Sequence, residues 1–126
     1  MPLIRISLRK GKPAVHIAAI RDAVYLSLRE TYNVPENDRF VLVHEHDDTG
    51  FDYDPTYLGI DRTDDVVFIQ ATVSNTRTVE QKQALYRRIA DRLAENPGLR
   101  REDVFINLIE VAKENWSFGN GEMQYA

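Results

Sequence analysis

Hydrophobic and polar side chains alternate over residues 2–8, as they do in a strand with one buried face. Turn-forming residues at 11–13 interrupt this pattern, and between residues 14 and 32 the apolar positions recur at spacings of three and four. A second turn at 33–37 precedes a segment rich in β-forming residues at 39–44. The first part of the chain is therefore predicted to fold as a strand, a helix and a second strand.

The same order of elements returns in the second half of the chain. A strand is predicted at 65–73, a helix at 79–94 and another strand at 103–111. Adding 65 to positions in the first half brings apolar residues and one aspartate onto similar residues of the second half. The matched pairs are Ile4 and Ile69, Ile20 and Leu85, Val24 and Ile89, Leu28 and Leu93, Val34 and Leu99, Asp38 and Asp103, and Phe40 and Phe105. Such a repeat indicates βαβ units that cannot bury their apolar faces alone.

Two units side by side predict one domain over residues 1–126, with repeat units at 2–46 and 65–111 and a tail at 112–126. The expected class is α+β in two layers, in which a four-stranded sheet carries both helices on one face and the crossovers are right-handed. The opposite face of the sheet would stay bare in a monomer, and an open apolar face favours association. We therefore expect a symmetric homo-oligomer.

Composition and charge restrict the possible partners and cofactors. Charged residues make up 29% of the chain, with mixed signs and a net charge of -4, which makes nucleic acid an unsuitable partner. No apolar run approaches the ~20 residues that span a bilayer, and no signal-peptide pattern opens the chain, so we expect a cytoplasmic protein without a membrane partner. There is no cysteine, and the three histidines (His16, His44 and His46) would leave a metal site mostly to carboxylates. We expect neither a metal nor another cofactor.

Pro2 is the first candidate for chemistry. An initiator Met before a small second residue is normally removed, and the chain would then begin with a secondary amine. Burial and nearby cations can tune the pKa of such an amine across neutral pH, which suits a general base or acid. Taken alone, however, Met-Pro at the start of a chain is common and carries little weight.

Arg77 is the second candidate, between the third predicted strand and a helix that opens with the capping box Thr78-Val-Glu-Gln81. A cation at a helix N-terminus opposes the macrodipole, so this position is odd for stability and suits anion binding. A guanidinium would hold a carboxylate through two parallel hydrogen bonds. The alternative is a solvated loop arginine, which Lys12 at the matching place in the first half favours, and the residues alone leave both open.

Asp38 is the third candidate, since a carboxylate at the entry to the second strand could orient a substrate or activate water. Its repeat partner Asp103 favours a plainer interpretation, in which both residues cap local backbone groups. The tail adds aromatic side chains, Trp116 and Phe118, among flexible glycines. These aromatics could wall a pocket or cover a neighbouring subunit, and the second use is the commoner.

Taken together, these segments resemble a known family. The residues that carry the resemblance are Pro2 after Met1, two βαβ units about 65 residues apart, Val34-Pro-Glu-Asn-Asp-Arg39, Arg77-Thr-Val-Glu-Gln-Lys82 and Trp116-Ser-Phe-Gly-Asn-Gly121. Their order and spacing, over nearly the whole chain, are similar to the malonate semialdehyde decarboxylase group of the tautomerase superfamily. The resemblance implies a homotrimer with an amino-terminal proline at the base of an apolar pocket.

The resemblance also implies roles for individual residues. Asp38 matches the family's aspartate that orients water or substrate, and Arg77 matches a carboxylate-binding arginine. An aromatic wall is matched by Trp116, Phe118 and Tyr125.

The chain departs from the decarboxylase pattern at one position, where Asn75 replaces a second arginine two residues before Arg77. A neutral amide can hydrogen-bond a carboxylate but supplies no second positive charge. We therefore predict a cofactor-free tautomerase of a small 2-oxo acid or its enol, in which Pro2 moves the proton, Arg77 anchors the carboxylate and Asn75 contacts it. The alternatives are a decarboxylase or hydratase of a 3-oxo or unsaturated acid, and a trimeric binding scaffold without catalytic activity.

Overall fold

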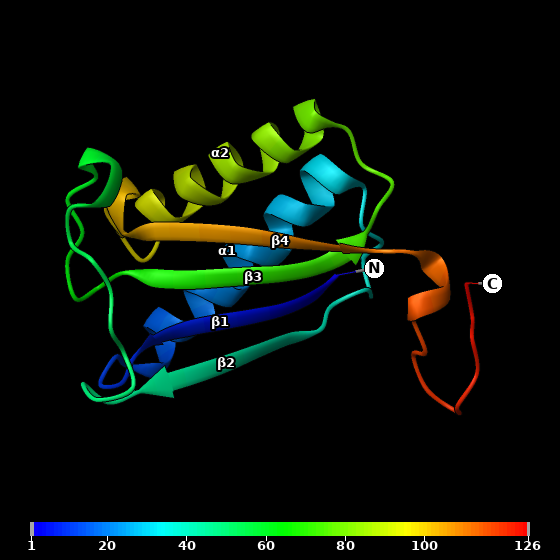
Figure 1. Ribbon diagram of the computed structural model, residues 1–126, viewed down its shortest axis with the longest axis horizontal. Helices are drawn as coiled ribbons and strands as arrows, with labels where there is room; N and C mark the ends of the chain where they lie inside the picture. The colour runs from blue at the N-terminus through cyan, green and yellow to red at the C-terminus, as the bar shows by residue number, and fades with distance from the viewer. Residues whose placement is uncertain (1, 126) are drawn as a thin grey trace.

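Two helices lie against one face of a four-stranded mixed sheet in the computed structural model, which describes residues 2–125 (Figure 1). The elements are β1 (Leu3–Arg9), α1 (Ala14–Tyr32), β2 (Val41–His46), β3 (Val67–Ser74), α2 (Val79–Glu95) and β4 (Val104–Val111), with short 3-10 turns η1 (Tyr57–Gly59), η2 (Arg101–Asp103) and η3 (Lys113–Asn115). The predicted α+β, two-layer class is confirmed. Each predicted element is present, although β2 and β3 begin two residues later than their periodicity indicates.

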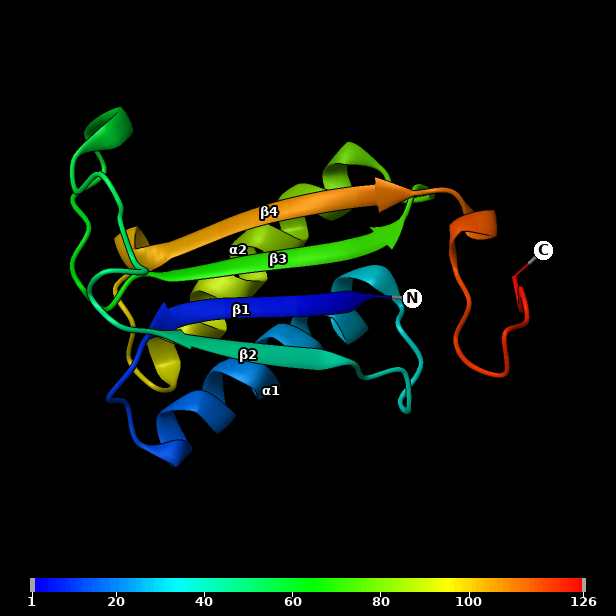
Figure 2. The ribbon, with the colours of Figure 1, turned by 60° about the horizontal axis from the view of Figure 1, so that its bottom comes forward.

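The sheet order, β2-β1-β3-β4, shows how the two repeats join. Within each unit the strands are parallel, β1 with β2 and β3 with β4, whereas the central pair β1 and β3 is antiparallel. In that central pair Leu3 lies opposite Thr72 and Ile6 opposite Ile69. Corresponding parts of the two units therefore lie at opposite ends of the sheet (Figure 2).

The core lies between the sheet and the helices, and it follows the repeat. Leu28 and Leu93 are both 0% exposed, as matched positions on the inner faces of α1 and α2. Ile4 and Ile69 are each 1% exposed on the strands beneath them. Burying one such side chain stabilises the fold by about 1.5–3 kcal/mol. The apolar repeat pairs thus form one continuous core that neither unit could form alone.

The matched aspartates have different surroundings. Asp103 is 1% exposed and accepts hydrogen bonds from the Thr63 backbone N–H at 2.7 Å and from the Thr63 hydroxyl at 2.6 Å. It therefore ties the loop before β3 to the start of β4. Asp38 lies at the other end of the sheet and is only half-buried. The structure thus gives the capping role to Asp103.

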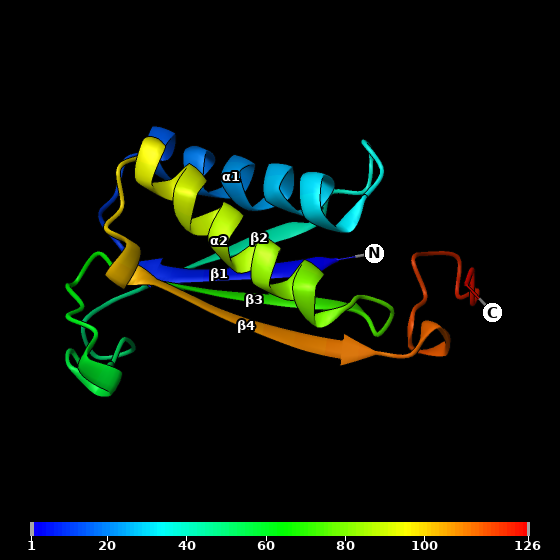
Figure 3. The same ribbon diagram turned by 90° about the horizontal axis from the view of Figure 1, so that it is seen from above.

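The second face of the sheet carries no helix (Figure 3). Large apolar side chains remain exposed there, and they are Phe40 (49%), Leu42 (46%), Phe105 (44%) and Ile109 (43%). Within residues 2–125, no helix is both long enough and apolar enough to cross a bilayer.

Replacing Asp103 by Ala should lower the free energy of unfolding by about 1–3 kcal/mol, because the two Thr63 donors lose a buried acceptor. Asp52→Ala, which removes an exposed carboxylate, is the control and should show no such loss. Urea denaturation at one fixed protein concentration measures both variants. Equal losses in the two variants would contradict the structural assignment of Asp103.

Candidate active site

The start of β1 lies beside the ends of β3 and β4, at the same end of the molecule as the C-terminal tail (Figures 1 and 2). This follows from the pairing, because β1 is antiparallel to β3 and β3 is parallel to β4. Pro2, which precedes β1, is buried. The loop between α1 and β2, the turn between β3 and α2, and η3 all reach the same end of the sheet.

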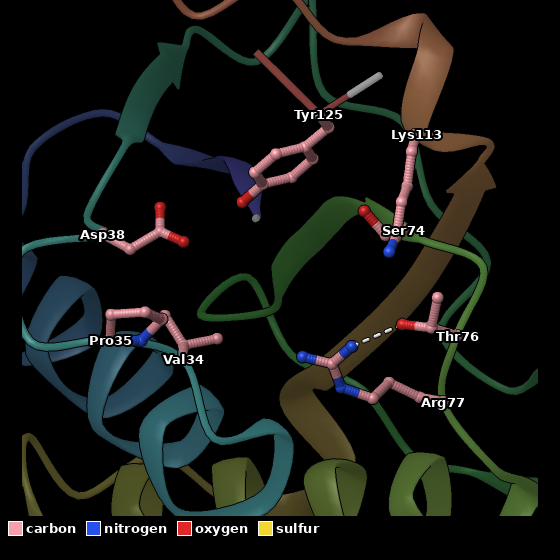
Figure 4. Close-up of a pocket in the computed structure, with 8 residues that line it drawn as sticks. All are labelled: Val34, Pro35, Asp38, Ser74, Thr76, Arg77, Lys113 and Tyr125. Atoms are coloured by element: carbon pink, nitrogen blue, oxygen red, sulfur yellow. Dashed lines mark hydrogen bonds between the residues drawn. The ribbon is translucent and has the colours of Figure 1, made fainter.

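A cavity of about 350 Å³, here called the charged cavity, opens among these segments (Figure 4). Its lining combines two cations, one carboxylate, hydroxyl groups and apolar side chains: Val34, Pro35, Asp38, Ser74, Thr76, Arg77, Lys113 and Tyr125. Asp38 faces Arg77 and Lys113 across the cavity in Figure 4. Among residues 2–125, no group of three or more His, Asp or Glu side chains is placed to hold a metal ion.

Arg77 is held in place by the end of α1. Its Nε and Nη2 donate to the Tyr32 carbonyl oxygen at 3.2 and 2.6 Å, and its Nη1 donates to the Thr76 hydroxyl. The guanidinium carbon also lies 5.1 Å from the centre of the Tyr32 ring, which gives a cation–π contact. Of the five N–H donors that a guanidinium has, one on each Nη remains for an anion.

This arrangement explains why an arginine is tolerated before α2. The last carbonyl groups of a helix have no partner within the helix and carry partial negative charge. Arg77 donates to the carbonyl of Tyr32, the last residue of α1, and Gln81 Nε2 donates to the carbonyl of Thr31 at 3.3 Å. The predicted Thr78–Gln81 capping box is present as well. The cation that opposes the dipole of α2 therefore complements the dipole of α1.

The ring of Tyr32 stays neutral beside this cation. Burial, with smaller contributions from nearby Tyr86 and Glu110, raises the pKa of the Tyr32 hydroxyl to about 12, while the Arg77 charge opposes the shift. At neutral pH Tyr32 is therefore protonated and contributes its π-face and its carbonyl oxygen.

Asp38 reaches the charged cavity from the loop that follows α1. Burial raises the pKa of its carboxyl above the usual value for aspartate. A carboxylate that is costly to ionise and lies near cations in a cavity has the character of a functional group. Whether Asp38 is catalytic remains a prediction, but its surroundings differ from those of the structural Asp103.

Pro2 lies between two spaces. On one side it lines a narrow crevice with Ser74 and Arg77, next to the charged cavity. On the other side it lines a cavity of about 440 Å³, here called the aromatic pocket, whose walls include Trp116 and Phe118. Met1 lies outside the described residues, so its removal and the free amine of Pro2 stay predictions.

The C-terminal tail folds back on itself through its aromatic side chains. Trp116 and Phe118 stack with ring centres 5.3 Å apart, and Phe118 meets Tyr125 edge-on at 4.8 Å. Trp116 Nε1 donates to the Ser74 hydroxyl at 3.2 Å, which fixes the tail to the end of β3. The three aromatics divide between two spaces, since Tyr125 lines the charged cavity and the other two line the aromatic pocket.

The structure separates one predicted site residue from the others and adds a new one. Asn75 is exposed on the turn after β3, its backbone N–H donates to the Val111 carbonyl at 3.0 Å, and it does not line the charged cavity. Lys113 lines that cavity although the sequence analysis did not single it out. Its position was the available signal, because polar residues just beyond neighbouring parallel strands emerge at the same edge of a sheet.

Comparison with known proteins identifies the family. Residues 38–119 match a family model described as tautomerase enzyme, and residues 2–60 match a second model with the same description. The chain belongs to the tautomerase family. It is 44% identical to the probable tautomerase YusQ of Bacillus subtilis (strain 168), over 98% of each chain. This tautomerase is accordingly an enzyme, as the sequence predicted.

Two solved structures are similar to this tautomerase along almost its whole length. One is FG41 malonate semialdehyde decarboxylase inhibited by 3-bromopropiolate, with 37% identity, a TM-score of 0.91, and coverage of 98% of this chain and 93% of that chain. The other is a malonate semialdehyde decarboxylase described as having decarboxylase and hydratase activities, with 29% identity, a TM-score of 0.91, and coverage of 98% and 95%. The resemblance to this group within the superfamily is confirmed.

Asp38→Asn should stabilise the tautomerase at pH 7. The pKa of Asp38 is raised in the folded state, so the ionised carboxylate costs stability above that pKa, and the cost disappears as the pH falls through the unfolded value of about 3.9. Asp54→Asn is a control of opposite sign, since hydrogen bonds from Thr56 lower the pKa of Asp54 and its contribution to stability is lost in acid. Urea denaturation at pH 7 and pH 3 should show the two opposite trends. A destabilised Asp38→Asn protein at pH 7 would count against the raised pKa.

Proposed function

We propose that this enzyme is a cofactor-independent tautomerase that interconverts a small 2-oxo acid and its enol, with Pro2 as the proton carrier. One observation carries the proposal: Arg77, held by Tyr32, keeps two donors for an anion in a cavity that borders the buried Pro2. A carboxylate bound to Arg77 would place the neighbouring carbons of a short acid within reach of the proline. The relative YusQ, named a probable tautomerase, supports the same reaction class.

The chemistry requires one proton to move between oxygen and carbon. In the enol-to-keto direction the amine of Pro2 takes the proton of the enol hydroxyl and delivers it to the third carbon of the acid, so nothing is consumed. General acid–base catalysis of this kind contributes roughly a hundred- to ten-thousand-fold in rate. Asp38, across the cavity from Arg77, would orient the reacting group or a water molecule.

The aromatic tail would strengthen these interactions by excluding water. Trp116 and Phe118 share with Pro2 the aromatic pocket, in whose lining the described residues place no charged side chain. Electrostatic interactions are stronger in a site from which water is excluded. Pro2 therefore borders both a charged region, which suits a carboxylate, and an apolar pocket formed by the tail. This combination suits an acid with an apolar substituent.

Decarboxylation or hydration of a 3-oxo or unsaturated acid is the second candidate. The two malonate semialdehyde decarboxylases with TM-scores of 0.91 favour it. So does Lys113, because it brings to the cavity a second positive charge that Asn75 does not supply. In this reaction Asp38 would activate water.

A comparison of two substrates tests the proposal. The wild-type enzyme should ketonise phenylenolpyruvate with a higher kcat/KM than it decarboxylates malonate semialdehyde, because ketonisation needs one anchored carboxylate and one proton carrier. Faster decarboxylation would make the second candidate the better account. Pro2→Ala, and wild-type protein that retains Met1 by intact mass, should lose nearly all turnover of either substrate. Unchanged turnover in both would exclude the amine as the catalyst and leave a binding scaffold or another base.

We further propose that the enzyme is a homotrimer built through the open face of the sheet. Four large apolar side chains lie more than 40% exposed there, and this face carries no helix. These side chains lie on or beside β2 and β4, the two edge strands, and exposed apolar surface at both edges of the face favours association.

Leu42→Asp should disrupt this assembly, because it places a charge among the exposed apolar side chains of the edge strand β2. Val15→Asp makes the same change on the solvent side of α1, where Val15 is 77% exposed, and should leave the assembly intact. Light scattering at micromolar concentration measures the mass of both variants and of the wild type. A wild-type monomer would contradict the proposal.

A further inference from the structure

The charged cavity contains two cations that come from different parts of the chain. Arg77 lies on the turn after β3, and Lys113 begins η3 just after β4. Because β3 and β4 are parallel and end as a pair, Ser74 opposite Val111, the two cations leave the sheet at the same edge. Two positive charges facing one small cavity repel each other, and an anionic ligand with more than one negative oxygen would relieve that repulsion.

Arg77 and Lys113 differ in how firmly they are held. Arg77 spends three donors on Tyr32 and Thr76. Lys113 forms no ion pair and no side-chain hydrogen bond within residues 2–125, whereas Lys82 pairs with Glu110 at 2.7 Å. In Figure 4 the Lys113 amine points into the cavity, which Ser74 also lines. The lysine is thus a flexible point charge with all its donors available for a ligand.

Ser74 provides a fixed partner for the same ligand atom. It is 6% exposed, and its oxygen accepts a hydrogen bond from Trp116 Nε1 at 3.2 Å. The hydroxyl proton is therefore left to be donated. Ser74 lines both the charged cavity and the crevice that contains Pro2. It therefore shares one lining with Arg77 and Pro2 and another with Arg77 and Lys113.

We propose that Lys113 and the Ser74 hydroxyl form a second binding point, for the oxygen on the carbon next to the substrate carboxylate, while Arg77 holds the carboxylate. The assignment rests on the proposed function, in which the carboxylate lies on Arg77 and the third carbon lies at Pro2. The oxygen of the second carbon then falls between them. The proposed substrates are therefore acids that carry an oxygen on the second carbon, which is the carbon next to the carboxylate.

This binding point would act where negative charge develops. When the amine of Pro2 removes a proton from the third carbon, the C–H electron pair forms a carbon–carbon double bond and the carbonyl pair moves onto the oxygen. Lys113 and Ser74 stabilise that oxygen until Pro2 gives it the proton and the enol forms, and the reverse sequence returns the proton to carbon. Donors aimed at developing charge stabilise the transition state more than the ground state.

Binding of two probes tests the assignment without turnover. Oxalate offers a carboxylate and further anionic oxygens on the adjacent carbon, whereas propionate offers one carboxylate only. Lys113→Met should raise the dissociation constant of oxalate about tenfold, which is equivalent to about 1.4 kcal/mol. The same variant should change the dissociation constant of propionate by less than about twofold. Arg77→Met should weaken both probes, and Lys10→Met, at an exposed position in the other end of the sheet, should affect neither. Dissociation constants come from NMR titration.

Two outcomes would overturn the inference. If Lys113→Met weakens both probes equally, Lys113 shares the carboxylate with Arg77, and if it weakens neither, Lys113 does not contact the ligand. Ser74→Ala should follow the Lys113 pattern, provided that emission from Trp116, the single tryptophan, shows an unmoved tail. Since no probe is turned over, failure of Pro2 as the catalyst would leave these results unchanged.

Discussion

The antiparallel pairing of β1 with β3 is the interaction on which the site depends. It joins the two βαβ units within the sheet, and it reverses one unit relative to the other. The first residue of the sheet therefore lies beside the last residues of the second unit. A parallel seam would carry Pro2 and Arg77 to opposite ends of the molecule. The backbone pairing that joins the two units thus also brings Pro2 of one repeat to the same end of the sheet as the Arg77 guanidinium of the other.

The helix ends couple the two units a second time. The free carbonyls at the end of α1 are satisfied by Arg77 and Gln81, which belong to the start of α2. The same contacts that complete one helix orient a cation toward the cavity, and the neutral Tyr32 ring supports it. Stability and ligand binding are therefore not separable at Arg77, whereas Lys113 forms no ion pair and no side-chain hydrogen bond within residues 2–125 and can serve a ligand at little structural cost.

Periodicity and the internal repeat were sufficient to predict the elements, the two layers and the buried face, because burial alone determines where apolar residues recur. The candidate site was harder to predict from the sequence. Asp38 and Asp103 have the same place in the repeat, and only the tertiary contact of Asp103 with Thr63 distinguishes them. Attention to Asn75 followed a family pattern along the chain, yet the second cation comes from Lys113, beyond a strand that is distant in sequence. Pairwise proximity of that kind depends on sheet order, which no local pattern contains.

The reversal of the two units gives the molecule a second, equivalent end, which is built differently. There the counterpart of Pro2 is Val67, fully buried within the chain and without a free amine. The counterpart of Arg77 is Lys12, whose amine is bound to Asp65, and Asp103 is engaged by Thr63. The segment that links the units supplies both partners, so these side chains are already engaged within the chain. In a dimer of two identical, unlinked units, every substitution would appear at both ends. In a tandem chain, one end can take on a structural role while the other end stays available for selection of a chemical function.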